Sequence, residues 1–235
     1  GFSQINKAIN VIVKSNPQVP QESISDGTDY IVQKDLGVNR TMLDYYAITM
    51  LAMLSFISIM LGSACIMGER QGKTIYRLKI ASISQVKLFF AKIFGLLPQT
   101  IIQISILMIL STTLFGAHYA ANVLDNLYLF LMFTMVTFTM ISIGVVYGIF
   151  IDINPMAVIM PVIWVMMFLS GTYSRELFIG GISKYMPIYQ VQEAAFDLAV
   201  FGRYQRANKV MLVCLSISVI MLIIGAVGFD KKEEK

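Results

Sequence analysis

Charged residues are scarce in this chain, and its five longest apolar stretches contain none. Only 14% of the 235 residues are charged and 57% are hydrophobic, whereas a soluble domain has about 25% charged residues. A stretch of about 20 apolar residues is long enough to cross the ~30 Å hydrocarbon core as a helix. The composition argues against an ordinary soluble enzyme. It predicts an all-α, polytopic membrane protein with five spans, at residues 45–67, 93–115, 127–151, 156–173 and 210–229.

Histidine is nearly absent too, and the five stretches contain no ionisable side chain of the Asp, Glu, Lys, Arg or His kind. The single histidine, His118, lies in a connection between spans. Proton-coupled transporters usually need an ionisable group inside the membrane, and an intramembrane hydrolase needs a base beside its nucleophile. These absences argue against a proton relay, catalysis at depth and a metal site built from His, Asp or Glu. Any uphill transport must take its energy from a partner protein.

Cysteine is equally sparse, with Cys65 and Cys214 each inside a predicted span and near opposite membrane faces. A disulfide needs Cα atoms within about 7 Å of each other, so we expect two free thiols. The net charge of +4 comes from basic residues concentrated in one loop and a tail. Nucleic-acid binding needs a continuous basic face, so we expect no nucleic-acid partner.

The basic residues that are present set the predicted topology. Six of them lie in the loop 68–92, against one acid, and short loops rich in Lys and Arg stay cytoplasmic. The tail 230–235 adds three lysines on the same side, which places the segment 1–44 outside. The connection 174–209 must then also be outside, although it carries five basic residues, which the acids Glu176, Glu193 and Asp197 accompany.

One side of the first span carries small residues, Ser55, Ser58 and Gly62. Small residues at this spacing let another helix approach closely. The approaching helix belongs either to the same subunit or to a second one, and the pattern does not distinguish the two.

The connection between the last two spans contains a predicted short helix. Gly171 breaks the preceding helix, and Gly202 ends the short one. Its apolar stripe, at helical spacing, consists of Ile188, Val191, Ala195 and Leu198. Such a helix is either re-entrant or interfacial.

The loop 68–92 is the most informative polar segment. Arg70, Lys73 and Arg77 share one face of a predicted short helix, and Leu78 lies on another. The Gly-Lys-Thr run that begins at Gly72 resembles the end of a phosphate-binding loop, but the first glycine of that motif is out of place. The short helix is either a cationic anchor resting on lipid headgroups or a lever that docks in a groove of a soluble partner.

Several short motifs, taken in order, resemble the ABC-2 type permeases. They are Asp44-Tyr45-Tyr46-Ala47, Glu69-Arg70 with Thr74, Arg77-Leu78, Ser82-Ile83-Ser84, Lys92, Leu169-Ser170-Gly171-Thr172 and Met186-Pro187. Lys73 between Gly72 and Thr74, and Ala81 in place of the usual proline, depart from the family pattern. The resemblance covers residues 44–202 and implies six spans. On that resemblance the family's first span would be missing here, and residues 1–44 would be the end of an extracellular region.

The resemblance also implies a function and its partners. The chain would be the transmembrane permease subunit of an ATP-binding cassette exporter, paired with a second permease subunit and with cytosolic ATPase subunits. It would not be an enzyme and would hold no cofactor or metal, because ATP and Mg²⁺ would bind to the partner ATPase. The coupling helix would be the segment 69–79, with ATPase contacts at Glu69, Arg70, Gly72, Thr74, Arg77 and Leu78.

In the family, the substrate path lies at the subunit interface, lined by the first and fourth spans of this chain. The candidate residues here are Ser55, Phe56, Ile59, Met160 and Trp164. An apolar path of this kind suits a lipid, a drug, a peptide or a lipid-linked glycan. The expected location is a bacterial plasma membrane, with several passes and the tail 230–235 in the cytoplasm.

Two other functions remain open. The first is a non-transporting membrane assembly or sensor-partner protein, which would use the basic loop as an anchor and would not depend on an ATPase. The second is a membrane enzyme with a site at the outer rim, built from His118, Asp125 or Glu193.

Overall fold

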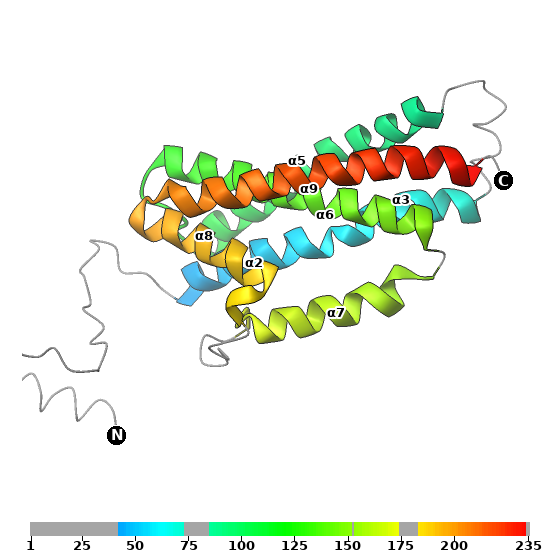
Figure 1. The fold of residues 1–235 in the computed structure, drawn as a ribbon. Helices are drawn as coiled ribbons and strands as arrows, with labels where there is room; N and C mark the ends of the chain where they lie inside the picture. The colour runs from blue at the N-terminus through cyan, green and yellow to red at the C-terminus, as the bar shows by residue number, and fades with distance from the viewer. Residues whose placement is uncertain (1–41, 73–84, 152, 174–182, 234–235) are drawn as a thin grey trace, which may run out of the picture. The chain divides into compact units, whose positions relative to one another are not determined.

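The computed structural model describes residues 42–72, 85–151, 153–173 and 183–233, and all regular structure in these residues is helical. The elements, drawn in Figure 1, are α2 (Met42–Ile57), α3 (Ile59–Gln71), α5 (Gln85–Phe115), α6 (Val123–Phe150), α7 (Pro155–Leu169), the 3₁₀ turn η2 (Ser183–Tyr185), α8 (Pro187–Phe201) and α9 (Tyr204–Glu233). They belong to one compact unit, Val38–Lys235. The predicted all-α class is confirmed.

Four stretches of the described chain are long and apolar enough to cross a membrane: Met42–Gly68, Phe89–Phe115, Val123–Phe150 and Tyr204–Gly228. Each corresponds to one predicted span. The fifth predicted span, 156–173, corresponds to α7, which has 15 residues and so a length of about 22 Å. The helix ends there because Gly171 adopts a left-handed conformation, with φ of 72°. Five complete spans are therefore not confirmed.

Following the predicted topology, we call the end of the bundle that holds the N-termini of α2, α6 and α9 the outer end, and the opposite end the inner end. Of the predicted extracellular segment 1–44, residues 1–41 are not among those that the structure describes. At the inner end, α9 continues to Glu233 and so includes most of the predicted tail. Both cysteines are free, as expected.

The first span is interrupted at Ser58, between α2 and α3. The Leu61 amide donates to the Ser58 carbonyl, three residues back, with an N–O distance of 3.0 Å; an α-helical bond would reach four residues back. The Ser58 hydroxyl donates to the Leu54 carbonyl at 2.8 Å, and bonds of this type often bend helices. The span consequently consists of two rods that meet within the membrane.

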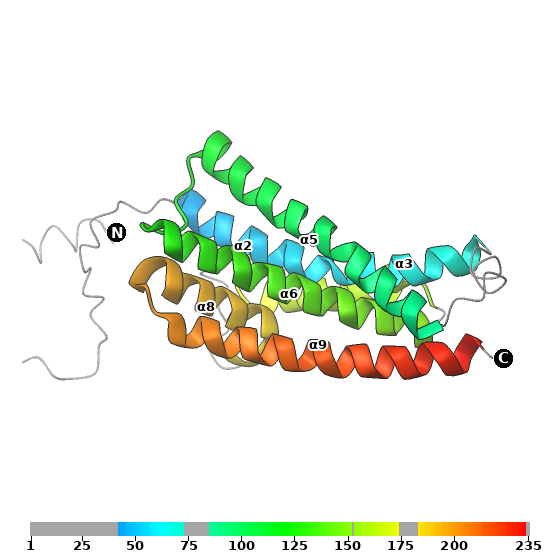
Figure 2. The ribbon, with the colours of Figure 1, turned by 90° about the horizontal axis from the view of Figure 1, so that it is seen from above.

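α6 lies at the centre of the bundle, where it contacts α2, α3, α5, α8 and α9 (Figure 2). Its buried side chains join two clusters. The outer cluster includes Leu129, Phe133 and Val136, and the inner one includes Ile141 and Val145. α5 and α9 lie at the periphery and expose many large apolar side chains, which suits helices that face lipid.

α3 and α6 approach so closely that their backbones touch. A Cβ atom added to Gly62 would lie 2.1 Å from the carbonyl oxygen of Ile141, and one added to Gly144 would lie 2.0 Å from that of Ile59. Glycine allows membrane helices to approach this closely. Of the two alternatives for the first span, the structure supports packing within one subunit for Gly62.

α8 confirms the predicted short helix before the last span. The four stripe residues are buried against the bundle, and Gly202 ends the helix with φ of 61°. α8 packs against α2, α6 and α9. In Figure 1 it occupies the outer part of the bundle, beyond the end of the short α7.

Candidate functional site

The inner end contains the start of the predicted coupling segment. α3 runs past the apolar part of its span to Gln71, so the backbone of Glu69 and Arg70 forms its last turn. Gly72 follows in an exposed turn, and its amide donates to the Gly68 carbonyl at 2.9 Å. The other predicted ATPase contacts, Thr74, Arg77 and Leu78, lie outside the described residues.

α3 is thus a continuous rod from the Ser58 break to the predicted coupling segment. Its glycine contact with α6 joins that rod to the centre of the bundle. Backbones in direct contact leave no side chain to rearrange between them, and close-packed interiors transmit strain. A displacement of the inner end of α3 would therefore move α6 as well.

The predicted substrate-path residues have different environments. Ser55 and Phe56 are buried in the core, and the Ser55 hydroxyl donates to the Leu51 carbonyl of its own helix at 2.8 Å. Ile59 and Met160 are half-buried. Trp164 is 50% exposed and stacks on Tyr173, with ring centroids 6.0 Å apart. Of the five, Trp164 is the most exposed.

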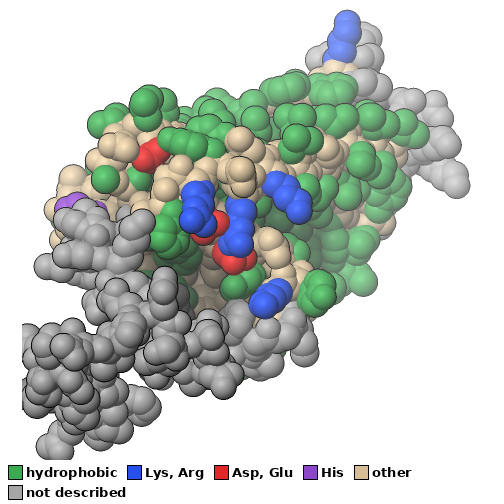
Figure 3. All heavy atoms as spheres, turned by 60° about the vertical axis from the view of Figure 1, so that its left-hand side comes forward, with side chains coloured by type: hydrophobic (Ala, Val, Ile, Leu, Met, Phe, Trp, Pro, Cys, Tyr) green, Lys and Arg blue, Asp and Glu red, His purple; other side chains and the backbone are tan. Residues whose placement is uncertain are grey.

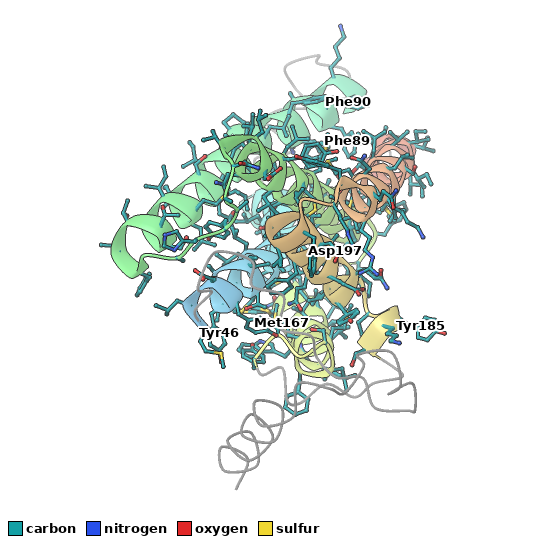
Figure 4. The ribbon with its side chains drawn as sticks, turned by 90° about the vertical axis from the view of Figure 1, so that its left-hand side faces the viewer. Tyr46, Phe89, Phe90, Met167, Tyr185 and Asp197 are labelled. Carbon is teal, nitrogen blue, oxygen red and sulfur yellow. The ribbon has the colours of Figure 1, made fainter. Side chains whose placement is uncertain are left out.

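At the outer end, the start of α2 is tied to the segment that follows α7. The Tyr45 hydroxyl donates to the Gly171 carbonyl at 2.8 Å, and the Tyr46 hydroxyl donates to the Tyr173 carbonyl at 3.3 Å. The Tyr45 ring also stacks on Phe196 of α8 at 5.2 Å. Figure 4 views this end, with Tyr46 labelled on α2 and Met167 on α7. These two tyrosines therefore connect α2 to α8 and to the segment that follows α7.

A cavity of about 560 Å³ lies beside this junction, between the start of α2, the end of α7 and α8. Tyr45, Gln192 and Phe196 are among its lining residues. Gln192 is 3% exposed, and its amide nitrogen donates to the Thr172 hydroxyl at 2.8 Å. Gln192 and Phe196 were not predicted from the sequence as site residues. The sequence signal that could have indicated this site was the amide side chain of Gln192, which lies next to the apolar stripe of α8.

Two acids that line this cavity, Glu193 and Asp197, are bound by Arg206 of α9. Its guanidinium lies 2.5 Å from a Glu193 oxygen and 3.2 Å from an Asp197 oxygen. Figure 3 shows acidic and basic side chains side by side on this face. Arg203 lies over the Phe201 ring at 5.2 Å. Two of the basic residues that the predicted topology places outside, Arg203 and Arg206, therefore have partners in the protein.

The residues proposed for an outer-rim enzyme site have separate environments. The His118 amide donates to Asp44 at 2.6 Å. Asp125 accepts hydrogen bonds from the Tyr204 hydroxyl and from the Asn122 side chain, while Glu193 pairs with Arg206. Among the described residues, no three His, Cys, Asp or Glu side chains are grouped to hold a metal ion.

Replacing Arg206 by glutamine is expected to lower the free energy of unfolding by about 1–2 kcal/mol, because two close carboxylates lose their cation. Partial solvent exposure keeps the effect below that of a fully buried pair; the side chains of Arg206, Glu193 and Asp197 are 52%, 34% and 17% exposed. Thermal unfolding in detergent measures the change.

Lys209→Gln is the control, since it removes an exposed cation from the same helix. Adding Glu193→Gln and Asp197→Asn to the Arg206→Gln variant should restore most of the lost stability. Equal melting temperatures for the Arg206 and Lys209 variants would contradict a stabilising role of the ion pairs.

The comparisons with known proteins agree with the helical bundle. The family model described as ABC-2 family transporter protein matches residues 2–229. The searches of curated proteins and of solved structures found no match. The match covers nearly the whole chain, including α2 to α8 and most of α9. This multi-pass membrane protein belongs to the ABC-2 family of transporters, as a non-catalytic transmembrane permease subunit of the kind that works with ABC ATPase subunits.

Proposed function

We propose that this chain is the permease subunit of an ATP-driven exporter, which moves an apolar or amphipathic substrate with energy from a separate ATPase. The observation that carries the proposal is the rigid connection from the inner end of α3 to the central helix α6. Gly62 and Gly144 make this connection by direct backbone contact. A movement delivered to the basic loop would thereby reach α3 and α6 together, and α3 belongs to the first span, one of the spans that would line the transport path.

The ATPase would dock on the segment that continues α3. Glu69, Arg70 and Gly72 begin this segment, and Thr74, Arg77 and Leu78 follow in sequence. Its cationic face suits an acidic groove in the partner. ATP and Mg²⁺ would bind in the partner alone.

The substrate path would form where two permease subunits meet. α7 supports this location because it exposes Val162, Trp164, Val165 and Phe168 and, within the described residues, packs mainly on α2 and α3. α7 would cross most of the bilayer, and α8 would complete the crossing at the outer end. The candidate path residues remain Ser55, Phe56, Ile59, Met160 and Trp164. Candidate substrates are a lipid, a drug, a peptide or a lipid-linked glycan, moved across a bacterial plasma membrane.

Reconstitution in vesicles tests this proposal. The permease with its co-purifying ATPase should move a fluorescent amphipathic substrate only when ATP and Mg²⁺ are supplied. The permease alone, with the same nucleotide, is the control and should give no uphill movement. Accumulation of substrate by the permease without an ATPase would refute the proposed energy source. Assembly with no movement under any nucleotide condition would favour the non-transporting alternative.

A further inference from the structure

A second cavity lies away from the proposed subunit interface, between α3 and α5. Its volume is about 440 Å³, and it adjoins the break at Ser58. Three of its lining residues are polar, Ser58, Gln99 and Gln103, and the others are apolar. Figure 2 shows α5 crossing obliquely over α2 and α3, and both of these helices contact α5.

The polar groups of this cavity lie at membrane depth. Gln103 is near the middle of the apolar stretch Phe89–Phe115, and Ser58 is well inside the stretch Met42–Gly68. A primary amide without a hydrogen-bonding partner is costly in hydrocarbon. Polar side chains in spans are therefore usually paired with each other or placed at a functional site.

The two glutamines are not fully paired within the described part of the chain. The Gln103 amide nitrogen contacts the Ser58 hydroxyl at 3.4 Å, which is long for a hydrogen bond. Within the same described residues, the Gln103 carbonyl oxygen and the whole Gln99 amide have no hydrogen-bonding partner.

The hydroxyl side chains of α5 behave differently. Each of them donates to a carbonyl of its own helix, at Thr100, Ser105, Ser111, Thr112 and Thr113. Side chains that bond their own helix are satisfied in lipid without any ligand. Among the described side chains of α5, Gln99 and Gln103, one helical turn apart, are thus the polar groups that still need an external partner.

We propose that this cavity binds an uncharged amphipathic molecule within the bilayer, with Gln99 and Gln103 hydrogen-bonding its polar group. An amide donates and accepts, so it suits a hydroxyl, ester or amide group. The lining residues include no ionisable side chain, so a charged group would enter without a counter-charge, at high cost. The volume lies within the usual range for small-molecule sites, about 300–1,000 Å³. The aliphatic walls, which include Ile57, Leu61 and Ile102, would hold the hydrocarbon portion.

The site lies where the two rods of the first span meet. Ser58 belongs to the break, while Gln99 and Gln103 belong to α5. A molecule bound to both would bridge the break and α5, and would restrain the angle between α2 and α3. This inference goes beyond the proposed function, since binding here needs neither an ATPase nor a second subunit.

Photo-crosslinking in lipid nanodiscs tests the inference on the permease alone, without nucleotide. The probe is a monoacylglycerol with a diazirine in its acyl chain, an uncharged molecule that carries hydroxyl and ester groups. We expect saturable labelling of Ile57, Leu61 or Ile102, mapped by mass spectrometry. Gln99→Leu and Gln103→Leu should each raise the probe concentration that gives half-maximal labelling about fivefold, as expected for the loss of one hydrogen bond. Leucine is compatible with lipid, so both variants should insert normally.

Thr112→Val is the matched control, because it removes a polar group from the same helix away from the cavity; it should leave labelling unchanged. Ile102→Trp should block labelling by filling the cavity. A photoreactive lysophosphatidylcholine of equal chain length should label the cavity less than the uncharged probe. Labelling that is non-saturable, or that neither glutamine substitution changes, would overturn the proposal. Reduced labelling with a simultaneous shift from dimer to monomer would assign the cavity to a second copy of this chain, and would overturn it as well.

Discussion

Gly62→Ala and Gly144→Ala are each expected to destabilise the folded bundle by about 3 kcal/mol, the upper part of the usual range for overpacking. The added methyl group would lie 2.1 Å and 2.0 Å, respectively, from a backbone carbonyl oxygen of the facing helix. Backbone atoms cannot rotate away as a flexible side chain can, so α3 and α6 must separate. Their separation would also loosen the buried side chains on both sides of the contact.

The glycines of this bundle provide a graded series for this measurement. At Gly148 the added atom would lie 3.0 Å from the Ser63 carbonyl oxygen, so Gly148→Ala should be intermediate. Gly95 in α5 has nothing within 4 Å of the added position. Gly95→Ala is the control and should be neutral or stabilising by up to about 1 kcal/mol through helix propensity. Heating in detergent followed by size-exclusion chromatography ranks the four variants. A loss of stability for Gly95→Ala equal to that for Gly144→Ala would contradict the close contact.

The same substitutions also examine the mechanical role of the contact. A variant that still folds with α3 displaced from α6 should bind the ATPase but couple poorly to it. We expect ATP hydrolysis to persist in such a complex while substrate movement falls. Parallel loss of hydrolysis and movement would instead indicate that the assembly itself has failed.

Reversing the charge of Arg70 and Arg77 together, to glutamate, is expected to reduce the co-purifying ATPase at least ~10-fold. Both cations lie on one face of the predicted short helix, and truncating or reversing charges in a close interfacial pair costs several kcal/mol. A tenfold change in affinity corresponds to only about 1.4 kcal/mol. Partial burial of either arginine against an acidic group of the ATPase is therefore sufficient to produce it. Quantitative immunoblotting of the ATPase retained on a tagged permease gives the measurement.

The control for this experiment is the double variant Lys184→Glu and Lys209→Glu, which changes the net charge by the same amount. Both lysines are exposed and lie near the outer end of the bundle. This control should retain the ATPase at the level of the unmodified protein. Membrane insertion is checked in both variants by resistance to alkaline extraction. Equal ATPase retention by the two double variants would refute a docking role for the basic loop and would favour a lipid anchor.

The membrane class and the approximate positions of the spans could be predicted because hydropathy is a local property. A run of apolar residues must avoid water whatever its neighbours are, and a backbone in lipid must bond within its own helix. The same local reasoning predicted α8, since Gly202 permits a left-handed end and the apolar stripe has helical spacing. For the site, the coupling segment stays a prediction, and the structure shows only that the backbone of its first residues, Glu69 and Arg70, lies in the last turn of α3.

Hydropathy could not predict which spans would be interrupted or shortened. Ser58 and the residues around it have the composition of an unbroken span, yet the helix is broken there. The span predicted at residues 156–173 contains no charged residue, yet α7 ends at Leu169. Both differences arise from the hydrogen bonds and turn conformations of single residues. Hydropathy averaged over about 20 residues does not resolve such local features.

By itself, the sequence determined that the chain is a helical membrane protein with a basic loop after its first predicted span, because hydropathy and charge are properties of local composition. Only the tertiary structure decided which small residues touch, which polar groups lack partners and where cavities lie. Gly62 and Gly144 are far apart in sequence, as are Ser58 and Gln103. Contacts of this kind depend on how two helices cross, and that angle is set by the packing of the whole bundle.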